Sequence, residues 1–124
     1  MGMFRCLALI INVNYSVMTH QAECILIDDI GEGLDCERSV NLIKLLIRKC
    51  NQHRFQLIMT TNNRFVMNEV ALKHWRIIDR RGGIVSLLNS QNSKKAFDEF
   101  KYLGLSNFDF FRTGAYLRGG KKYY

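Results

Sequence analysis

Apolar and polar positions follow one another along the chain in blocks that predict a mixed α/β fold. Residues 2–13 are apolar apart from Arg5 and Asn12, which predicts a helix that is apolar on most of its circumference. Such a helix usually lies buried between two layers. Residues 14–23 are more polar and predict a connection. Residues 24–29 contain four apolar residues followed by two aspartates, which predicts a short buried strand.

The next blocks predict a second strand parallel to the first. Asp35 is a candidate N-cap for a helix that extends to about residue 51. Its expected buried face comprises Val40, Ile43, Leu46, Ile47 and Cys50. Residues 55–61 predict a strand that is closed by Asn62-Asn63. A strand, a helix of about four turns and a second strand form a βαβ unit with parallel strands.

The rest of the chain predicts smaller elements. A short helix is expected over residues 65–72, and strands over 75–79 and 84–88 are joined by Arg80-Arg81-Gly82-Gly83, a good hairpin signal. A helix is expected over 93–103 with Ala96, Phe97, Phe100 and Leu103 facing inward.

The tail from residue 104 is aromatic, and its aromatic side chains are expected to dock on a core more readily than to stack on bases. These aromatic residues are Phe108, Phe110, Phe111, Tyr116, Tyr123 and Tyr124.

Composition fits one globular domain. The chain has 124 residues, of which 48% are hydrophobic and 23% charged, and it shows no internal repeat or linker. The four cysteines have neither Cys-x-x-Cys spacing nor a nearby histidine pair, so we expect small buried hydrophobes in a reducing compartment, the cytoplasm. The apolar run near the start is too short to span a bilayer, so no membrane association is expected.

Charge is unevenly distributed along the sequence. The formal net charge is +7, yet residues 1–50 carry five Lys/Arg against six Asp/Glu, and residues 51–124 carry thirteen against five. A basic half of this kind is typical of partners such as nucleic acid or nucleotide phosphate. The alternative, that these side chains simply cover exposed helix faces, is the more common origin of such charge.

Two adjacent carboxylates end the first predicted strand. Asp28 and Asp29 repel each other when both are ionised and are costly in an apolar interior. They are tolerated at the end of a strand when a cation lies opposite, and Mg²⁺ bound to a nucleotide phosphate is a common one. Ligands of parallel sheets bind at the carboxyl ends of the strands, so Asp28, Asp29 and Asn62 should share one rim. The alternative is a strand followed by a solvated acidic turn.

In this order the features resemble the C-terminal part of an ABC-type ATPase head, of the SMC-, RecF- and OLD-like AAA group. Residues 25–29, Ile-Leu-Ile-Asp-Asp, are similar to a Walker B strand, and residues 30–35, Ile-Gly-Glu-Gly-Leu-Asp, to a D-loop. Residues 57–62, which end in Thr-Thr-Asn, resemble the switch strand. Residues 2–5 resemble the end of the signature motif. The resemblance covers about residues 2–90.

The resemblance implies a role for single residues. Asp28 would hold Mg²⁺ through water, and Asp29 stands where a glutamate normally polarises the attacking water. Asn62 would contact the γ-phosphate of ATP. Asp35 would reach across a dimer interface, and Gly2 would belong to the face that closes over the nucleotide of a partner.

The sequence also departs from the family. Asp29 is one methylene shorter than glutamate, and Asn62 cannot carry a proton as the usual histidine can. The Walker A pattern, whose amides and lysine hold the phosphates, is absent; the nearest string, residues 115–122, has Ala for the first Gly and Lys for the hydroxyl residue, and we reject it.

The expected fold is therefore α/β, a partial P-loop ATPase core with a mostly parallel sheet plus a C-terminal β-hairpin and helix. The expected function is that of the C-terminal lobe of an ABC/AAA-type ATPase, with Mg²⁺ and ATP bound only once a missing or separate Walker A lobe completes the site. The complete head would form a head-to-tail homodimer, and this chain alone should not hydrolyse ATP. The alternatives are a non-catalytic basic module that binds nucleic acid or a partner ATPase, and a degenerate gene remnant.

Overall fold

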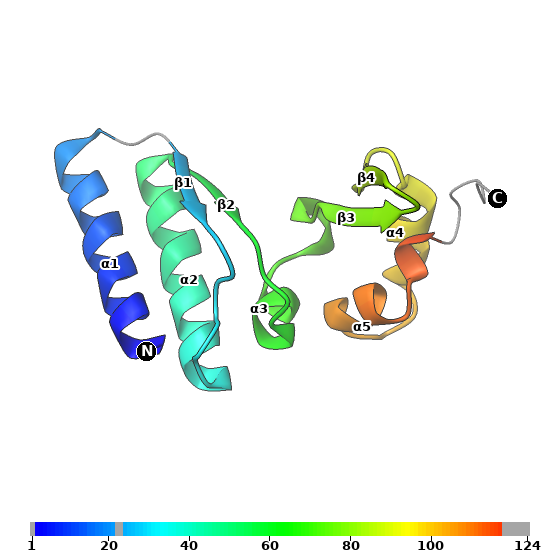
Figure 1. Ribbon diagram of the computed structural model, residues 1–124, viewed down its shortest axis with the longest axis horizontal. Coiled ribbons are helices and arrows are strands. Elements are labelled where there is room, and N and C mark those ends of the chain that lie inside the picture. The colour runs from blue at the N-terminus through cyan, green and yellow to red at the C-terminus, as the bar shows by residue number, and fades with distance from the viewer. Residues whose placement is uncertain (1, 22–23, 118–124) are drawn as a thin grey trace. The chain divides into compact units, whose positions relative to one another are not determined.

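The computed structural model describes residues 2–21 and 24–117 of the chain. Contacts divide the chain into two compact units, residues 1–69 and residues 70–124. We call these unit 1 and unit 2 and describe each by itself (Figure 1). The α/β class and the C-terminal hairpin and helix predicted from the sequence are confirmed.

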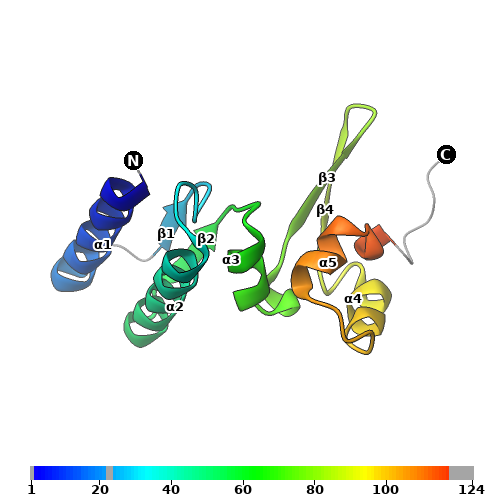
Figure 2. The same cartoon turned by 90° about the horizontal axis from the view of Figure 1, so that it is seen from below.

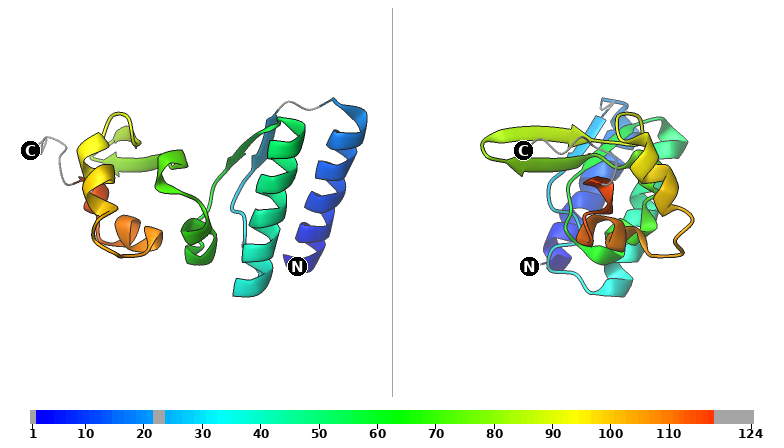
Figure 3. Two further views of the ribbon diagram at one scale, coloured as in Figure 1. Left: turned by 180° about the vertical axis from the view of Figure 1, so that it is seen from behind. Right: turned by 90° about the vertical axis from the view of Figure 1, so that its right-hand side faces the viewer.

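Unit 1 contains a parallel pair of strands beside two long helices. Its elements are α1 (Gly2–Thr19), β1 (Cys24–Ile27), α2 (Cys36–His53), β2 (Gln56–Met59) and α3 (Arg64–Glu69). Ile25 lies opposite Leu57 and Ile27 opposite Met59 in the parallel register, as the βαβ prediction required. Figure 3 shows both strands running along α2. The parallel sheet is two-stranded within the described residues.

The sequence of α2 accounts for its start and its buried face. The carboxylate of Asp35 accepts a hydrogen bond from the backbone N–H of Arg38 at 2.8 Å, so Asp35 is the N-cap that we predicted. Ile43, Leu46 and Cys50 are buried as expected, whereas Val40 and Ile47 are half-buried. Burial raises the pKa of the Cys50 thiol.

Helix α1 is longer and less covered than the sequence predicted. It continues to Thr19, so residues 14–19 are helix and not connection. The side chains of Asn14 and Thr19 donate to the carbonyls of Ile10 and Tyr15 at 3.0 and 2.9 Å, which satisfies these polar groups within the helix. The expectation of burial between two layers is wrong for α1 in this structure, because only Val13 is buried among its described residues.

The cysteines differ from the sequence-based expectation as well. All four are free thiols, yet only Cys50 is buried; Cys6 is half-buried, and Cys24 and Cys36 are exposed. Cys24 belongs to the outer face of β1, which α2 does not cover, and Cys36 lies in the first turn of α2. A cysteine within or beside an apolar run therefore need not be buried.

Unit 2 combines a hairpin with short helices. Its elements are η1 (Leu72–His74), β3 (Ile77–Arg81), β4 (Ile84–Leu88), α4 (Lys94–Phe100), α5 (Asn107–Arg112) and η2 (Ala115–Leu117). The predicted hairpin is confirmed, with Arg81 opposite Ile84. Gly82 and Gly83 have φ angles of +52° and +84°, the backbone that a two-residue type I′ turn demands and that glycine adopts without strain. Figure 2 shows the hairpin extending past the helices of unit 2.

Phe110 of α5 lies at the centre of the core of unit 2. Its side chain is fully buried, with ring centroids 4.7 Å from Phe97 and 4.8 Å from Phe100. Trp75 and Tyr116 approach the same ring edge-on. The predicted docking of the aromatic tail is therefore confirmed for Phe110. Tyr123 and Tyr124 lie outside the described residues.

Two details of unit 2 differ from the sequence analysis. Leu103 is 54% exposed, so its predicted inward position is wrong, because α4 ends at Phe100. Helix α5 was not predicted. It begins with a capping box, in which the Ser106 hydroxyl and the Asp109 side chain satisfy each other's backbone N–H groups. The hydrogen bond from Ser106 lowers the pKa of the Asp109 carboxyl.

Within the described residues, no helix combines the length and the apolar character needed to cross a membrane.

We predict that Phe110→Ala destabilises unit 2 by about 3–5 kcal/mol, the usual cost of removing a buried phenylalanine. Phe111→Ala is the matched control, because Phe111 is its neighbour in the chain but is 42% exposed. Urea unfolding followed by circular dichroism measures both. Equal losses of free energy of unfolding for the two variants would contradict a core centred on Phe110.

Candidate functional site

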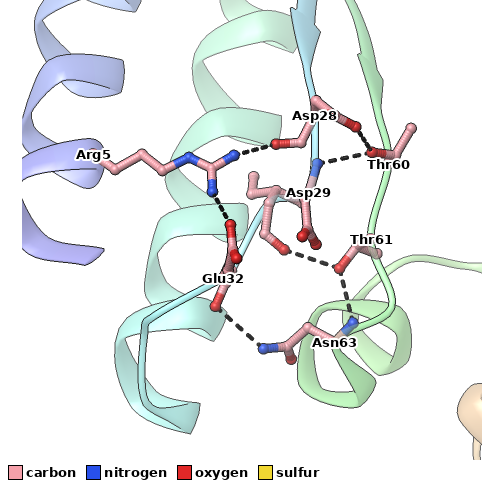
Figure 4. A network of polar contacts seen from close by, with 9 residues as sticks. Arg5, Asp28, Asp29, Glu32, Thr60, Thr61 and Asn63 are labelled. Atoms are coloured by element: carbon pink, nitrogen blue, oxygen red, sulfur yellow. Dashed lines mark hydrogen bonds and ion pairs between the residues drawn. The ribbon is translucent and has the colours of Figure 1, made fainter. Parts of the chain in front are cut away.

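The candidate site lies where β1 and β2 end. Strand pairing continues past both ends, because the Thr60 N–H donates to the Ile27 carbonyl and the Ile30 N–H donates to the Thr60 carbonyl, each at 2.9 Å. The two strand ends therefore meet at one edge, and Asp28, Asp29 and Thr60 lie together there (Figure 4). We call this edge the carboxylate rim.

Thr60 connects the two aspartates. Its hydroxyl donates to Asp28 Oδ1 at 2.5 Å and accepts from the Asp29 backbone N–H at 2.8 Å. One side chain on β2's end thus fixes the carboxylate of Asp28 and the backbone of Asp29. Hydrogen bonds to a charged acceptor are stronger than neutral ones, so this link orients the rim.

Asp29 adopts an unusual backbone conformation. Its φ angle is +51°, a region that residues other than glycine seldom occupy. Keeping a residue there costs of the order of 1–3 kcal/mol and persists where neighbouring groups hold it. Here the Thr60 hydroxyl on one side and the buried side chain of Ile30 on the other hold it. Such strain is often found at functional sites.

Arg5 is the nearby cation, but it does not pair with the rim carboxylates. Its guanidinium donates to Glu32 Oε2 at 2.6 Å and to the backbone carbonyl of Asp28 at 2.5 Å. Figure 4 shows these two contacts on the α1 side of the rim. Within the described part of the chain, no Lys, Arg or His forms an ion pair with the carboxylate of Asp28 or Asp29.

The start of α1 is fixed against the turn that follows the rim. A Cβ atom placed on Gly2 would lie 2.1 Å from the carbonyl oxygen of Gly33, so no other residue fits there unless the backbone moves. Gly2, which we predicted to belong to a face closing over a partner's nucleotide, therefore packs on the chain's own turn. Gly31 and Gly33 both have positive φ, which explains the Gly-x-Gly spacing.

The two other predicted residues, Asp35 and Asn62, take no part in the hydrogen bonds of the rim. Asp35 is not at the rim: its carboxylate caps α2 and pairs with Arg38 at 3.2 Å. Asn62 follows Thr60 and Thr61 at the end of β2 and is exposed, and its side chain makes no hydrogen bond to another described residue.

Three residues of this network were not among the site residues predicted from the sequence. Thr60 carries the link between the aspartates, and Arg5 ties α1 to the turn. Asn63 caps α3 by accepting from the Phe65 N–H at 2.9 Å, and its amide donates to the Gly31 carbonyl at 3.4 Å. Thr60 could have been recognised in the sequence, because it is a hydroxyl residue near the end of the predicted strand that pairs with the strand before Asp28. Arg5 and Asn63 required the tertiary structure.

The donor set of the rim suits a hydrated magnesium ion. Mg²⁺ keeps several waters and usually takes one or two carboxylates plus phosphate oxygens from its surroundings. Asp28 is exposed and Asp29 half-buried, so both reach solvent. Residues 2–21 and 24–117 contain no group of three or more His, Cys, Asp or Glu side chains that could enclose a metal. The rim therefore fits Mg²⁺ held through water and shared with another ligand, and not a closed metal cage.

Within the described residues, the rim has no enclosed pocket of nucleotide size. A depression beside it is lined by residues of α1, the rim and the following turn, including Gly2, Arg5, Asp29 and Glu32, and it has room for about one water molecule.

No protein-family model matches the chain. Searches among curated proteins and among solved structures also give no significant match.

We predict that Thr60→Val lowers the free energy of unfolding of unit 1 by about 1–2 kcal/mol, because it removes a hydrogen bond to a charged group and leaves the Asp29 N–H without its acceptor. Thr60→Ser retains the hydroxyl and should lose less than half as much. Chemical denaturation measures both variants. A Thr60→Val protein as stable as the wild type would show that the link does not hold the rim.

Proposed function

We propose that this chain supplies the metal- and water-binding half of an ATP site in an ABC-type AAA ATPase, and that a Walker A loop outside this chain completes the site. One observation carries the proposal: at the carboxyl edge of a parallel strand pair, the Thr60 hydroxyl bonds the carboxylate of Asp28 and the backbone N–H of Asp29, and no described side-chain cation forms an ion pair with either carboxylate. The order of the motifs along the sequence supports the same function. The four free thiols agree with a reducing cytoplasm.

In this proposal the two aspartates act differently. Asp28 would hold Mg²⁺ through water, with its Oδ1 oriented by Thr60. Mg²⁺, when bound, would offset the charge of the phosphates. Asp29 would orient the attacking water by accepting a hydrogen bond from it. Because aspartate is shorter than glutamate, we expect weaker activation of water than in heads that carry glutamate.

The other predicted residues contribute less directly. Asn62 would donate a hydrogen bond from its amide to a γ-phosphate oxygen, but it cannot take up a proton. Gly2 begins α1 and packs on Gly33 of the turn after the rim, whereas Asp35 ends that turn and caps α2. A role for them in nucleotide binding would arise only in a head-to-tail dimer of the complete head.

The half-site should hold a metal only weakly, so we predict that Mn²⁺, used in place of Mg²⁺ at millimolar concentration and without ATP, broadens amide NMR signals at the rim. Asp28, Asp29 and Asn62 should be affected most in the ¹⁵N-labelled chain, and Asp28→Asn should abolish the effect. Glu37→Gln is the matched control, because Glu37 is an exposed acid in the first turn of α2. ATP should not be hydrolysed by the chain alone.

Two outcomes would contradict the proposal. Broadening that is equal at Glu37 and at the rim would indicate a non-specific acidic surface. ATP turnover by the purified chain that Asp29→Asn abolishes would show that no second lobe is needed.

A second candidate function, nucleic-acid binding, is favoured by how the charge divides between the units. Unit 1 contains seven Lys/Arg and seven Asp/Glu, whereas unit 2 contains eleven Lys/Arg and four Asp/Glu. The whole net charge of +7 therefore belongs to unit 2. Among its described cations, Lys73, Arg76, Arg80 and Lys94 are without an ion pair.

If unit 2 binds nucleic acid, the binding is dominated by phosphate contacts and weakens steeply with salt. The double variant Arg76→Gln/Arg80→Gln should weaken binding to single-stranded DNA or RNA severalfold and reduce the salt dependence. Arg48→Gln, an exposed arginine of unit 1, and Asp28→Ala should leave binding unchanged. Fluorescence anisotropy at several salt concentrations measures this, and no binding at low salt would exclude this function.

A further inference from the structure

Helix α1 has an exposed apolar stripe along its length. The stripe consists of Met3, Phe4, Leu7, Ile11, Tyr15 and Met18, each more than half exposed. From Phe4 onward its members recur every three or four residues, which keeps them on one side of a helix. Ribbon views place α2 on one side of α1 and no other element of unit 1 on the opposite side (Figures 1 and 3). The stripe lies on that uncovered side.

The opposite side of α1 is already packed. Val13 is buried there, and Cys6, Leu9 and Ile10 are half-buried. Lys49 of α2 donates to the side chain of Asn14 at 2.7 Å, which anchors this side further. A helix that is apolar on two sides usually lies between two layers. In unit 1, α2 provides one of these layers.

The stripe contains no charge that would prevent two copies from meeting. Arg5 is the one charged residue of α1, and its guanidinium is held by Glu32 and the Asp28 carbonyl. The exposed area of the stripe is several hundred Å². This is close to the area of the largest apolar patches on monomeric proteins and to the lower range of areas buried in dimer interfaces.

The spacing of the stripe is the same in both directions. From Phe4 to Leu7, Ile11, Tyr15 and Met18, the steps are three, four, four and three residues. A two-fold axis through Ile11 therefore places Ile11 on its own copy, Leu7 on Tyr15, and Phe4 on Met18. A symmetric dimer requires such a self-complementary surface, and rows of residues three and four apart are those that pack between helices.

We propose that α1 pairs antiparallel with α1 of a second copy of this chain, with Ile11 at the two-fold axis. This dimer is separate from the proposed ATP site. Helix α1 is about 27 Å long at 1.5 Å per residue, and its first residue packs beside the rim. The two rims therefore lie near opposite ends of the paired helices and do not complete each other. Loss of ATP binding would not disprove the dimer, and loss of the dimer would not disprove the half-site.

Sedimentation velocity over a range of micromolar concentrations tests the proposal. The wild-type chain should shift from monomer to dimer as concentration rises. Ile11→Asp places two carboxylates at the axis and should weaken dimerisation at least a hundredfold, because like charges brought together at an interface cost several kcal/mol. Ile78→Asp is the matched control: Ile78 is an exposed isoleucine of unit 2, and its variant should dimerise as the wild type does. Circular dichroism checks that both variants are folded.

Disulfide trapping tests the orientation. In a background with Cys6→Ala, Cys24→Ser and Cys36→Ser, Ile11→Cys should form a covalent dimer on mild oxidation. Phe4→Cys alone should not, but it should cross-link to Met18→Cys when the two variants are mixed. A wild-type chain that stays monomeric, a dimer that survives Ile11→Asp, or efficient self-cross-linking of Phe4→Cys would each overturn the proposal. Binding of a different protein to an exposed stripe on a monomer would do the same.

Discussion

Parallel pairing of β1 with β2 is the constraint on which the rest of unit 1 depends. It brings two chain segments more than thirty residues apart to one edge, where the Thr60 hydroxyl reaches both Asp28 and Asp29. The pairing also requires a crossover, which α2 provides, with its start fixed by the Asp35 cap. The positive φ of Asp29 is tolerable because this edge holds it on both sides. Without the pairing, the aspartates would be an ordinary acidic turn.

Local signals in the sequence were sufficient for much of this architecture. The apolar run before Asp28, the cap at Asp35 and the Gly82-Gly83 turn each act within a few residues, so β1, α2 and the hairpin could be predicted. The predicted burial of β1 is wrong, because Leu26 is 74% exposed and no residue of the strand is fully buried. Parallel pairing followed from the strand–helix–strand order. Helix α5 has an equally local signal, the Ser106-x-x-Asp109 capping box, which the aromatic character of the tail obscured.

Other features depend on partners distant in sequence and could not be predicted in the same way. Whether Gly2 faces solvent or a turn is decided by Gly33, and the partner of Arg5 is decided by how α1 packs. The apolar circumference of α1 correctly indicated a helix, but its stripe is exposed in the single chain. If a second copy covers the stripe, the apolar pattern of α1 indicates burial in the dimer and not in the single chain. Burial of Cys24 and Cys36 failed for a related reason, since apolar neighbours in sequence do not determine which face is covered.

In the proposed half-site the two rim carboxylates have different roles, one toward a metal and one toward water. Titration of Mg²⁺ into the ¹⁵N-labelled chain without ATP, which would itself bind the metal, distinguishes these roles when Asp28→Asn and Asp29→Asn are compared with the wild type. Thr60 orients the carboxylate of Asp28 but only the backbone of Asp29. We therefore expect Asp28→Asn to weaken Mg²⁺ binding at least about tenfold, or 1.4 kcal/mol. Asp29→Asn should change the affinity for Mg²⁺ by no more than about twofold. Equal losses in the two variants, or no loss in either, would contradict it and leave the rim as a solvated acidic turn.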